Sequence, residues 1–411
     1  VHALTARARP GAGGLNAQAA AAIENALLDL KARALGVPVF ELFGGAVRRR
    51  IPVYASHVGL YRMRRPELFR AAGAVVPRSL DDFATLGAEV AARGIGALKT
   101  NLLTSDACGG ARIPMPGFAR GAHADPALNA SRALVADACR LVERLRAGAG
   151  AGAELMLDLN FNLRPEGVRR LAAALDPLGL AWIEVDGIDP RTLATLRSAI
   201  ATPVASLETV HGRAAMLPFL EARAVDVAIV DPMWNGLGES VRMAALAEAF
   251  GVNVASHLFS GALATAISAH FCAVVPNLRI MELDLDRAPW HDALFVGGVA
   301  LEDGHAVVPD GPGWGVVPDE AALAGIDVGV LPRLADRHRH AQSREVPRVS
   351  GADPAGRRSA CPAERARASR TPRPPSSSAR SRRHRARPAS SPGAAAQCAS
   401  ASSSSPPASC T

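Results

Sequence analysis

Residues 154–208 read ELMLDLNFNLRPEGVRRLAAALDPLGLAWIEVDGIDPRTLATLRSAIATPVASLE and decide the fold class of this chain. Three short apolar runs, at 154–160, 180–186 and 203–208, are separated by stretches whose apolar residues recur every three or four positions. The short runs predict strands, and the periodic stretches predict amphipathic helices. Strands and helices that alternate in this order are typical of a parallel sheet built from repeated βα units.

The same alternation continues in both directions from this stretch. Similar apolar runs predict five more strands, at 51–56, 97–103, 225–231, 252–257 and 279–284. Helical candidates lie between successive runs. Eight strands with intervening helices predict an α/β fold, a closed TIM-like barrel of the (β/α)7β kind, with the barrel domain at 50–290.

The positive charge of the chain is concentrated at its C-terminus. The whole chain carries a formal charge of +8, and residues 341–411 contain 13 Arg, no Lys and 3 acidic residues, a net charge of +10. The remaining −2 on residues 1–340 gives no electrostatic reason to expect a nucleic-acid partner. Residues 341–411 also lack Leu, Ile, Phe, Met, Tyr and Trp, so we expect a disordered tail rich in Arg, Ser, Pro and Ala.

Cysteine usage and hydropathy indicate the compartment. The six cysteines show no CxxC spacing, so neither a disulfide framework nor a cysteine metal site is predicted. The sequence shows neither the apolar core of a signal peptide near its start nor an apolar run of 18 residues later. We therefore expect a cytoplasmic enzyme with no membrane partner.

Nearly every predicted strand ends in an ionisable or amide side chain. In a barrel enzyme the C-terminal ends of the strands form the active-site face, so these side chains would converge on one mouth. One such residue alone could simply meet solvent or cap the next helix, but seven strands that share the feature indicate a site. The residues are Lys99 and Asn101, Asp158 and Asn160, Glu184, Glu208, Asp231, His257 and Glu282.

As a set, these residues resemble those of the mandelate racemase branch of the enolase superfamily, from about Ala20 to Asp319. Residues 21–45 resemble the helix and Gly-Gly turn that lead into the family's barrel, and residues 309–317 resemble its returning segment. The resemblance implies that residues 1–49 are a remnant of a capping domain to which residues 291–340 return. It also implies a Mg²⁺ cofactor, a small-molecule carboxylate substrate and a homo-oligomer.

Asp158, Glu184 and Glu208 match the three carboxylates that bind magnesium in this family. Their spacings of 26 and 24 residues each correspond to one βα unit. Mg²⁺ is a hard cation that takes carboxylate oxygens and keeps open positions for water or substrate. Three carboxylates placed so close together would repel one another without a cation.

Asp231 and His257 match the family's aspartate–histidine dyad on the sixth and seventh strands. A carboxylate beside an imidazole fixes its tautomer and raises its basicity, so the ring can remove a proton from carbon. The proton α to a carboxylate is weakly acidic, and its removal requires a metal and a hydrogen-bond donor that stabilise the enediolate. Glu282 matches the residue that hydrogen-bonds the substrate carboxylate opposite the metal.

The second strand departs from the family pattern. The family commonly shows Lys-x-Lys there, with the second lysine as a base on the face opposite the histidine, whereas this chain has Lys99-Thr100-Asn101. Asparagine cannot accept a proton, so His257 is left as the single evident carbon base. A racemase normally needs two bases, and a dehydratase needs one base plus an acid, so we expect a hydro-lyase acting on a sugar acid. Lys99 would pair with the substrate carboxylate, and Asn101 and Asn160 would bind the substrate.

Alternatives to a dehydratase remain open. An epimerase, racemase or cycloisomerase would use Lys99 as its second base, and an inactive truncated remnant would have no turnover. The connection at 104–128 is long enough for an active-site lid, with Arg112 and Arg120 as candidate contacts for a dicarboxylate. His211 and His270 are expected to cap or pack helices.

Overall fold

The computed structural model describes residues 13–114, 130–287 and 291–325. The chain divides into one unit at Val1–Pro332 and a second at Arg333–Thr411, and the second lies wholly outside the described residues. The predicted disordered tail at 341–411 and the candidate contact Arg120 are therefore outside the described residues as well.

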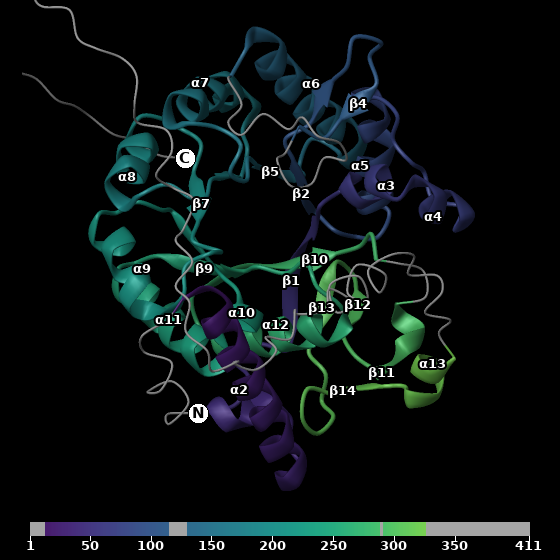
Figure 1. The fold of residues 1–411 in the computed structure, drawn as a ribbon, viewed down its shortest axis with the longest axis vertical. Coiled ribbons are helices and arrows are strands. Elements are labelled where there is room, and N and C mark those ends of the chain that lie inside the picture. Colours follow the sequence, from purple (N-terminus) through teal and green to yellow (C-terminus); the bar gives the residue numbers. More distant parts are fainter. Residues whose placement is uncertain (1–12, 115–129, 288–290, 326–411) are drawn as a thin grey trace, which may run out of the picture. The chain divides into compact units, whose positions relative to one another are not determined.

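Eight parallel strands close into a barrel, because β10 pairs with β1 (Figure 1). The barrel strands are β1 (Arg50–Ser56), β2 (Ala97–Asn101), β5 (Glu154–Asp158), β6 (Trp182–Glu184), β7 (Val204–Ser206), β8 (Val227–Val230), β9 (Asn253–Ser256) and β10 (Leu278–Asp284). Each predicted strand overlaps one of them, with ends that agree to within two residues. The predicted (β/α)7β fold is confirmed.

Helices surround the strands and connect each one to the next (Figure 1). In α7, Pro165 occupies the first turn, and Val168, Leu171 and Leu175 form the buried stripe that a helix packed on a sheet requires. None of the helices in the described ranges is long and apolar enough to span a membrane. The connecting helices are α3 (Leu60–Arg64), α4 (Pro66–Ala71), η3 (Leu80–Asp82), α5 (Phe83–Ala91), α6 (Arg132–Ala149), α7 (Pro165–Leu175), η4 (Asp176–Leu178), α8 (Pro190–Ser198), α9 (Gly212–Glu221), α10 (Pro232–Asn235), α11 (Leu237–Ala249) and α12 (Ala262–Val274).

The inside and the outside of the barrel have separate cores, because side chains alternate along each strand. In β5, Leu155 and Leu157 pack outward against the helices, whereas Met156 packs inside the barrel. Asp158, two residues after Met156, therefore faces inward at the C-terminal end of the strand. The interior core contains Tyr54, Ala97, Met156, Trp182, Ala205, Val227, Ile229, Ala255 and Ile280.

The segments before and after the barrel meet beside it. Helix α2 (Gly14–Leu35) lies along α10 and α11 (Figure 1). Trp314 donates its indole N–H to the carbonyl of Asn25, and its backbone N–H to Asp29. The other elements of these segments are η2 (Val39–Phe43), η5 (Asp292–Leu294), β11 (Phe295–Gly297), β12 (Ala300–Glu302), β13 (His305–Val307), β14 (Val316–Pro318) and α13 (Glu320–Ala324).

The long connection after β2 begins with a short hairpin of β3 (Thr104–Ser105) and β4 (Ala111–Arg112). Arg112 is exposed there. Residues 115–129 of the expected lid lie outside the described residues.

Candidate active site

The barrel brings the predicted strand-end residues to one mouth. Lys99 and Asn101 lie on β2, Asp158 ends β5, Glu184 ends β6, and Glu282 lies near the end of β10. All five are buried. Each follows an interior residue by an even number of positions, so strand alternation turns all of them into the barrel.

An acidic cluster forms at the ends of β6 and β7. One carboxylate oxygen from each of Glu184, Asp186 and Glu208 lies within 4.8 Å of the others. Glu184 and Glu208 are two of the three predicted metal ligands, and both reach this cluster. Asp158, the third, is not one of the clustered residues, and its Oδ2 lies 3.9 Å from Nζ of Lys99.

Asp186 is a site residue that the sequence reasoning missed. It lies two positions after Glu184, so strand alternation turns both carboxylates to the same side. This spacing could have identified Asp186 from the sequence. Its Oδ1 accepts hydrogen bonds from Oγ of Ser206, at 3.1 Å, and from the backbone N–H of Leu207, at 3.0 Å. Leu207 has φ of +96°, a rare conformation for a side chain other than glycine, and Glu208 follows it directly. Asp186 thus holds the bend from which Glu208 reaches the cluster.

The electrostatics of the cluster suit a divalent cation. Burial raises the pKa of Glu208 well above its usual value, and the charges of Asp186 and Glu184 raise it further. Burial, followed by the charge of Glu184, raises the pKa of Asp158 to about 8 and that of Asp186 to about 6. Oε1 of Glu184 is buried without a hydrogen-bond partner among the described residues. Hard oxygen ligands, mutual repulsion and an unsatisfied buried oxygen together fit Mg²⁺.

Lys99 links the acidic cluster to Glu282. Its Nζ lies 2.7 Å from Oε2 of Glu184 and 3.1 Å from Oε1 of Glu282. Burial alone would lower the pKa of Lys99, but the two glutamates outweigh it and hold the pKa well above its usual value. A lysine so paired is a fixed cation, so the structure argues against the alternative in which Lys99 is the second base.

Both carboxylate oxygens of Glu282 accept hydrogen bonds. It accepts from the hydroxyl of Ser56 and from the backbone N–H of Leu258. Burial raises the pKa of Glu282, but Lys99 and then His257 and His57 lower it, to a net value of about 2. To hydrogen-bond a substrate carboxylate as predicted, Glu282 would have to be protonated. The lowered pKa disfavours the protonated form in the free protein.

His257 and Asp231 lie as the predicted dyad requires. Nδ1 of His257 is 2.7 Å from Oδ2 of Asp231, and Nε2 points to Glu208 at 3.3 Å. Burial lowers the pKa of His257, but Glu208 and Asp231 outweigh it and raise the pKa to about 10. Oδ1 of Asp231 is fixed separately, because it accepts from the backbone N–H groups of Met233 and Trp234 at the start of α10.

The two predicted substrate-binding amides meet on the other side of the mouth. Nδ2 of Asn101 lies 3.3 Å from Oδ2 of Asp158 and 3.1 Å from Oδ1 of Asn160. Oδ1 of Asn101 faces Nδ1 of His57 at 3.3 Å. His57 follows β1 directly and was assigned no role from the sequence, although it too ends a strand of the barrel.

The two histidines expected to cap or pack helices have different surroundings. His270, buried in α12, accepts the backbone N–H of Phe40 on Nδ1, which places it in the core. His211 precedes α9 and makes no side-chain cap, and its ring stacks on Trp234 with centroids 6.4 Å apart. Trp234 in turn lies 5.0 Å from the ring of His257, so aromatic rings line the dyad's side of the mouth.

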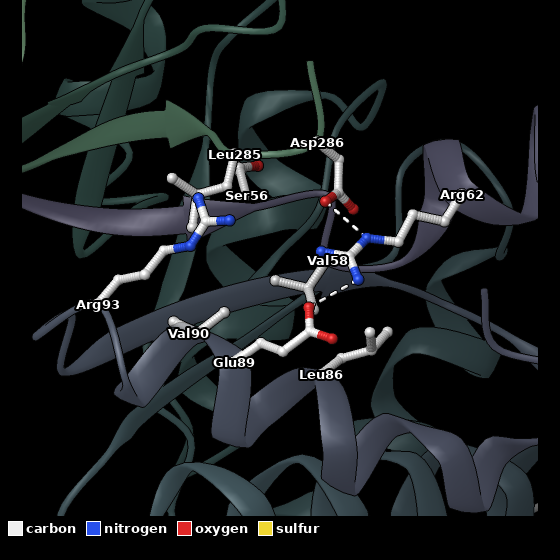
Figure 2. Close-up of a pocket in the computed structure, with 9 residues that line it drawn as sticks. All are labelled: Ser56, Val58, Arg62, Leu86, Glu89, Val90, Arg93, Leu285 and Asp286. Atoms are coloured by element: carbon white, nitrogen blue, oxygen red, sulfur yellow. Dashed lines mark hydrogen bonds and ion pairs between the residues drawn. The ribbon is translucent and has the colours of Figure 1, made fainter. Parts of the chain in front are cut away.

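A small cavity is lined by residues of β1, α3, α5 and the segment after β10, and none of them belongs to the acidic cluster (Figure 2). Arg62 crosses it and bonds Asp286 and Glu89, each at 2.7 Å. The free space is about 10 Å³, room for one water molecule and not for a substrate. This cavity is too small for a substrate, so the residues at the strand ends remain the candidate site.

Comparisons with known proteins agree with this geometry. The family model described as "Enolase C-terminal domain-like" matches residues 82–322, more than half of the chain. The model of the mandelate racemase / muconate lactonizing enzyme N-terminal domain matches residues 2–44.

Two curated relatives are sugar-acid dehydratases. The D-xylonate dehydratase of Haloferax volcanii is 26% identical over 73% of this chain and 67% of its own length. The D-gluconate dehydratase of Thermoproteus tenax is 30% identical over 75% of this chain, which spans only 56% of that relative.

Among solved structures, a protein from Burkholderia xenovorans strain LB400, assigned as an L-alanine-DL-glutamate epimerase, is 42% identical. The match covers 79% of this chain and 80% of that chain, with a TM-score of 0.75. A second structure of that protein is bound to magnesium and fumarate. With its closed barrel, its acidic cluster and these matches, the chain belongs to the mandelate racemase and muconate lactonizing enzyme family of the enolase superfamily.

Proposed function

We propose that this protein is a Mg²⁺-dependent dehydratase that removes the proton α to the carboxylate of a sugar acid and then expels water. The observation that carries the proposal is the placement of the His257–Asp231 dyad beside the acidic cluster, with Nε2 of His257 3.3 Å from Glu208. A base beside a cation site is what enolisation of a carboxylate requires.

Each group has a defined task in this reaction. Asp158, Glu184 and Glu208 are the proposed metal ligands, with Asp186 supporting Glu208. When bound, Mg²⁺ would stabilise the negative charge that develops on the substrate carboxylate.

The proton transfers fall to residues of the chain itself. Asp231 holds the N–H of His257 on Nδ1, so the lone pair of Nε2 takes the α-proton and the electron pair passes to the carboxylate. The imidazolium then supplies the proton that leaves with the β-hydroxyl as water. Lys99 would attract the substrate carboxylate to this position.

The sugar-acid assignment rests on the relatives and on β2. Both curated relatives described above dehydrate sugar acids, D-xylonate in one case and D-gluconate in the other. At Asn101 this chain has an amide instead of a second lysine base, and an amide suits recognition of substrate hydroxyls.

Epimerisation at the α-carbon is the second candidate. The 42% identical Burkholderia protein is assigned as an epimerase of L-alanine-DL-glutamate, a dipeptide with a free carboxylate. That reaction starts with the same proton abstraction and differs in the fate of the enediolate.

One experiment separates these functions. The protein is incubated with Mg²⁺ in D₂O with D-gluconate, D-galactonate, D-xylonate and L-alanyl-glutamate, and NMR follows α-deuterium and 2-keto product. Dehydration gives 2-keto acid from at least one sugar acid, and epimerisation gives deuterium without keto product. His257→Asn serves as the control for background exchange. Absence of both signals from every compound contradicts the proposal.

We propose a cytoplasmic homo-oligomer whose partner is a small-molecule carboxylate, and neither nucleic acid nor a membrane. The near-neutral charge of residues 1–340 supports the exclusion of nucleic acid. Sedimentation analysis with and without Mg²⁺ would measure the oligomeric state.

A further inference from the structure

We propose that His57 is a second proton-transfer residue, which enolises the substrate from the face opposite His257. The inference rests on the proposed function, because it assumes that the site abstracts α-protons. It extends that function to both epimers at the α-carbon. The lysine that the family commonly places on this side is replaced by Asn101, and the histidine that contacts Asn101 comes from the neighbouring strand.

The orientation of the Asn101 amide fixes the tautomer of His57. The NH₂ group of Asn101 donates to Oδ2 of Asp158, at 3.3 Å, and to Oδ1 of Asn160, at 3.1 Å. The carbonyl of Asn101 then faces Nδ1 of His57, at 3.3 Å. A carbonyl also only accepts, so Nδ1 of His57 carries the hydrogen. In the neutral ring this leaves the lone pair on Nε2.

That lone pair lies in the mouth of the barrel. Nε2 of His57 is buried and has no hydrogen-bond partner among the described residues. It lies 3.9 Å from Oε1 of Glu282, the residue predicted to contact the substrate carboxylate. A buried nitrogen left without a partner in the free protein is the expected state of a group whose partner is the substrate.

The backbone also marks this position. His57 has φ of +54°, a conformation uncommon for residues other than glycine, directly after the last residue of β1. Residues held in such conformations concentrate at functional sites, where the strain directs a side chain. Here it accompanies a ring packed edge-on against Tyr61, with centroids 5.4 Å apart.

The two histidines reach the mouth of the barrel from different strands. His57 follows β1 and contacts Asn101 of β2, whereas His257 follows β9 and contacts Asp231, which follows β8. Strand β10, which carries Glu282, lies between β1 and β9. Burial has the largest effect on the pKa of His57 and lowers it. The charge of Glu282 raises this pKa, whereas the positive charges of Lys99 and His257 lower it. A lowered pKa favours the neutral ring, which is the form that a base requires.

The step at His57 mirrors the step at His257. For an epimer whose α-hydrogen faces β1 and β2, the C–H bond breaks, its proton goes to Nε2 of His57, and its electron pair passes to the carboxylate. The enediolate either loses its β-hydroxide or regains a proton at the α-carbon. A proton returned by His57 retains the configuration, and one returned by protonated His257 inverts it.

The tautomer can be tested without a substrate. Protein with ¹⁵N-labelled histidine is examined at pH 7 with Mg²⁺, and the His57 signals are identified by their loss in His57→Gln. We expect hydrogen on Nδ1 and an unprotonated Nε2. Hydrogen on Nε2 would overturn the proposal.

Stereospecific exchange tests the function. The probes are two pairs that differ only at the α-carbon, D-gluconate with D-mannonate and L-alanyl-L-glutamate with L-alanyl-D-glutamate. We expect the wild type to deuterate both members of one pair, and His57→Gln to lose at least about 100-fold in exchange of one member only. His305→Gln, which removes a histidine outside the mouth, should change neither member.

The outcomes distinguish the two proposals. If the wild type exchanges one member only, or His57→Gln affects both members equally, the role of His57 is wrong and the proposed function stands. If the wild type exchanges no member of either pair and dehydrates none of the sugar acids, both proposals fail.

Discussion

The two sides of the barrel mouth hold a histidine in the same way but with different partners. On the side of β8 and β9, Nδ1 of His257 lies 2.7 Å from a carboxylate, that of Asp231. On the side of β1 and β2, Nδ1 of His57 lies 3.3 Å from an amide carbonyl, that of Asn101. Both arrangements leave Nε2 for the site.

The partners give the two rings opposite electrostatics. The pKa of His257 is raised to about 10, because Glu208 and Asp231 outweigh its burial, whereas burial lowers the pKa of His57. The pKa values of the two rings are thus shifted in opposite directions. The comparison teaches that the residue at the end of the neighbouring strand decides how a strand-end histidine can act.

The largest expected effect is that of His257→Asn. Because asparagine cannot accept a proton, we expect turnover to fall by about 10²–10⁴-fold or more, the range of a general base. Mg²⁺ affinity, measured by calorimetry, should stay nearly unchanged because the ring is not a proposed ligand. Retained turnover would show that the dyad is not the base.

Asp231→Asn tests the carboxylate side of the comparison. Oδ1 at this position accepts from Met233 and Trp234, so the new NH₂ group would face Nδ1 of His257 and move its hydrogen to Nε2. Loss of the correct tautomer costs about 10⁴-fold in the serine protease triad, and we expect a fall in kcat on the order of 10³-fold or more. Asparagine caps a helix as well as aspartate, so the melting temperature should change little. Unchanged kcat would contradict the tautomer argument.

Substitutions in the acidic cluster test which carboxylates hold the metal. Loss of a residue that only orients a metal ligand weakens metal binding by roughly 10- to 100-fold. Glu208→Gln and Asp158→Asn remove proposed ligands, so each should weaken Mg²⁺ binding by more than that. Asp186→Asn should fall within that range, because it acts through Leu207. Calorimetry measures all three, with the exposed Glu302→Gln as the control. A larger loss for Asp186→Asn than for Asp158→Asn would reverse their assignments.

His270 provides the smallest expected effect and a contrast with both site histidines. Burial lowers its pKa in the folded protein to about 4, from a usual value of 6.5. As the pH falls, His270 therefore binds a proton in the unfolded chain at a higher pH than in the folded protein. Stability is therefore full above pH 6.5 and is lost toward pH 4. Between pH 7 and pH 5 we expect a loss of about 2 kcal/mol in the free energy of unfolding. Urea unfolding at both values should show a smaller loss in His270→Gln, and an equal loss would refute the assignment.

The sequence by itself determined the barrel and most of its mouth. The alternation of apolar runs with helical periodicity is local, so residues such as Glu184 and His257 could be placed at strand ends without any tertiary contact. Parallel strands of a barrel have their C-terminal ends on one face, so these residues had to converge. Their spacing could not reveal which of them touch.

Only the tertiary structure pointed to Asp186 and His57. Asp186 accepts a hydrogen bond from the N–H of Leu207, which directly follows the next strand, and His57 faces the amide of Asn101. Lys99 was an open candidate for the second base until its contacts with Glu184 and Glu282 were known. The physical reason is the same for all three residues. Protonation states are set by neighbours within about 3–4 Å, and barrel closure brings together neighbours that are far apart in the chain.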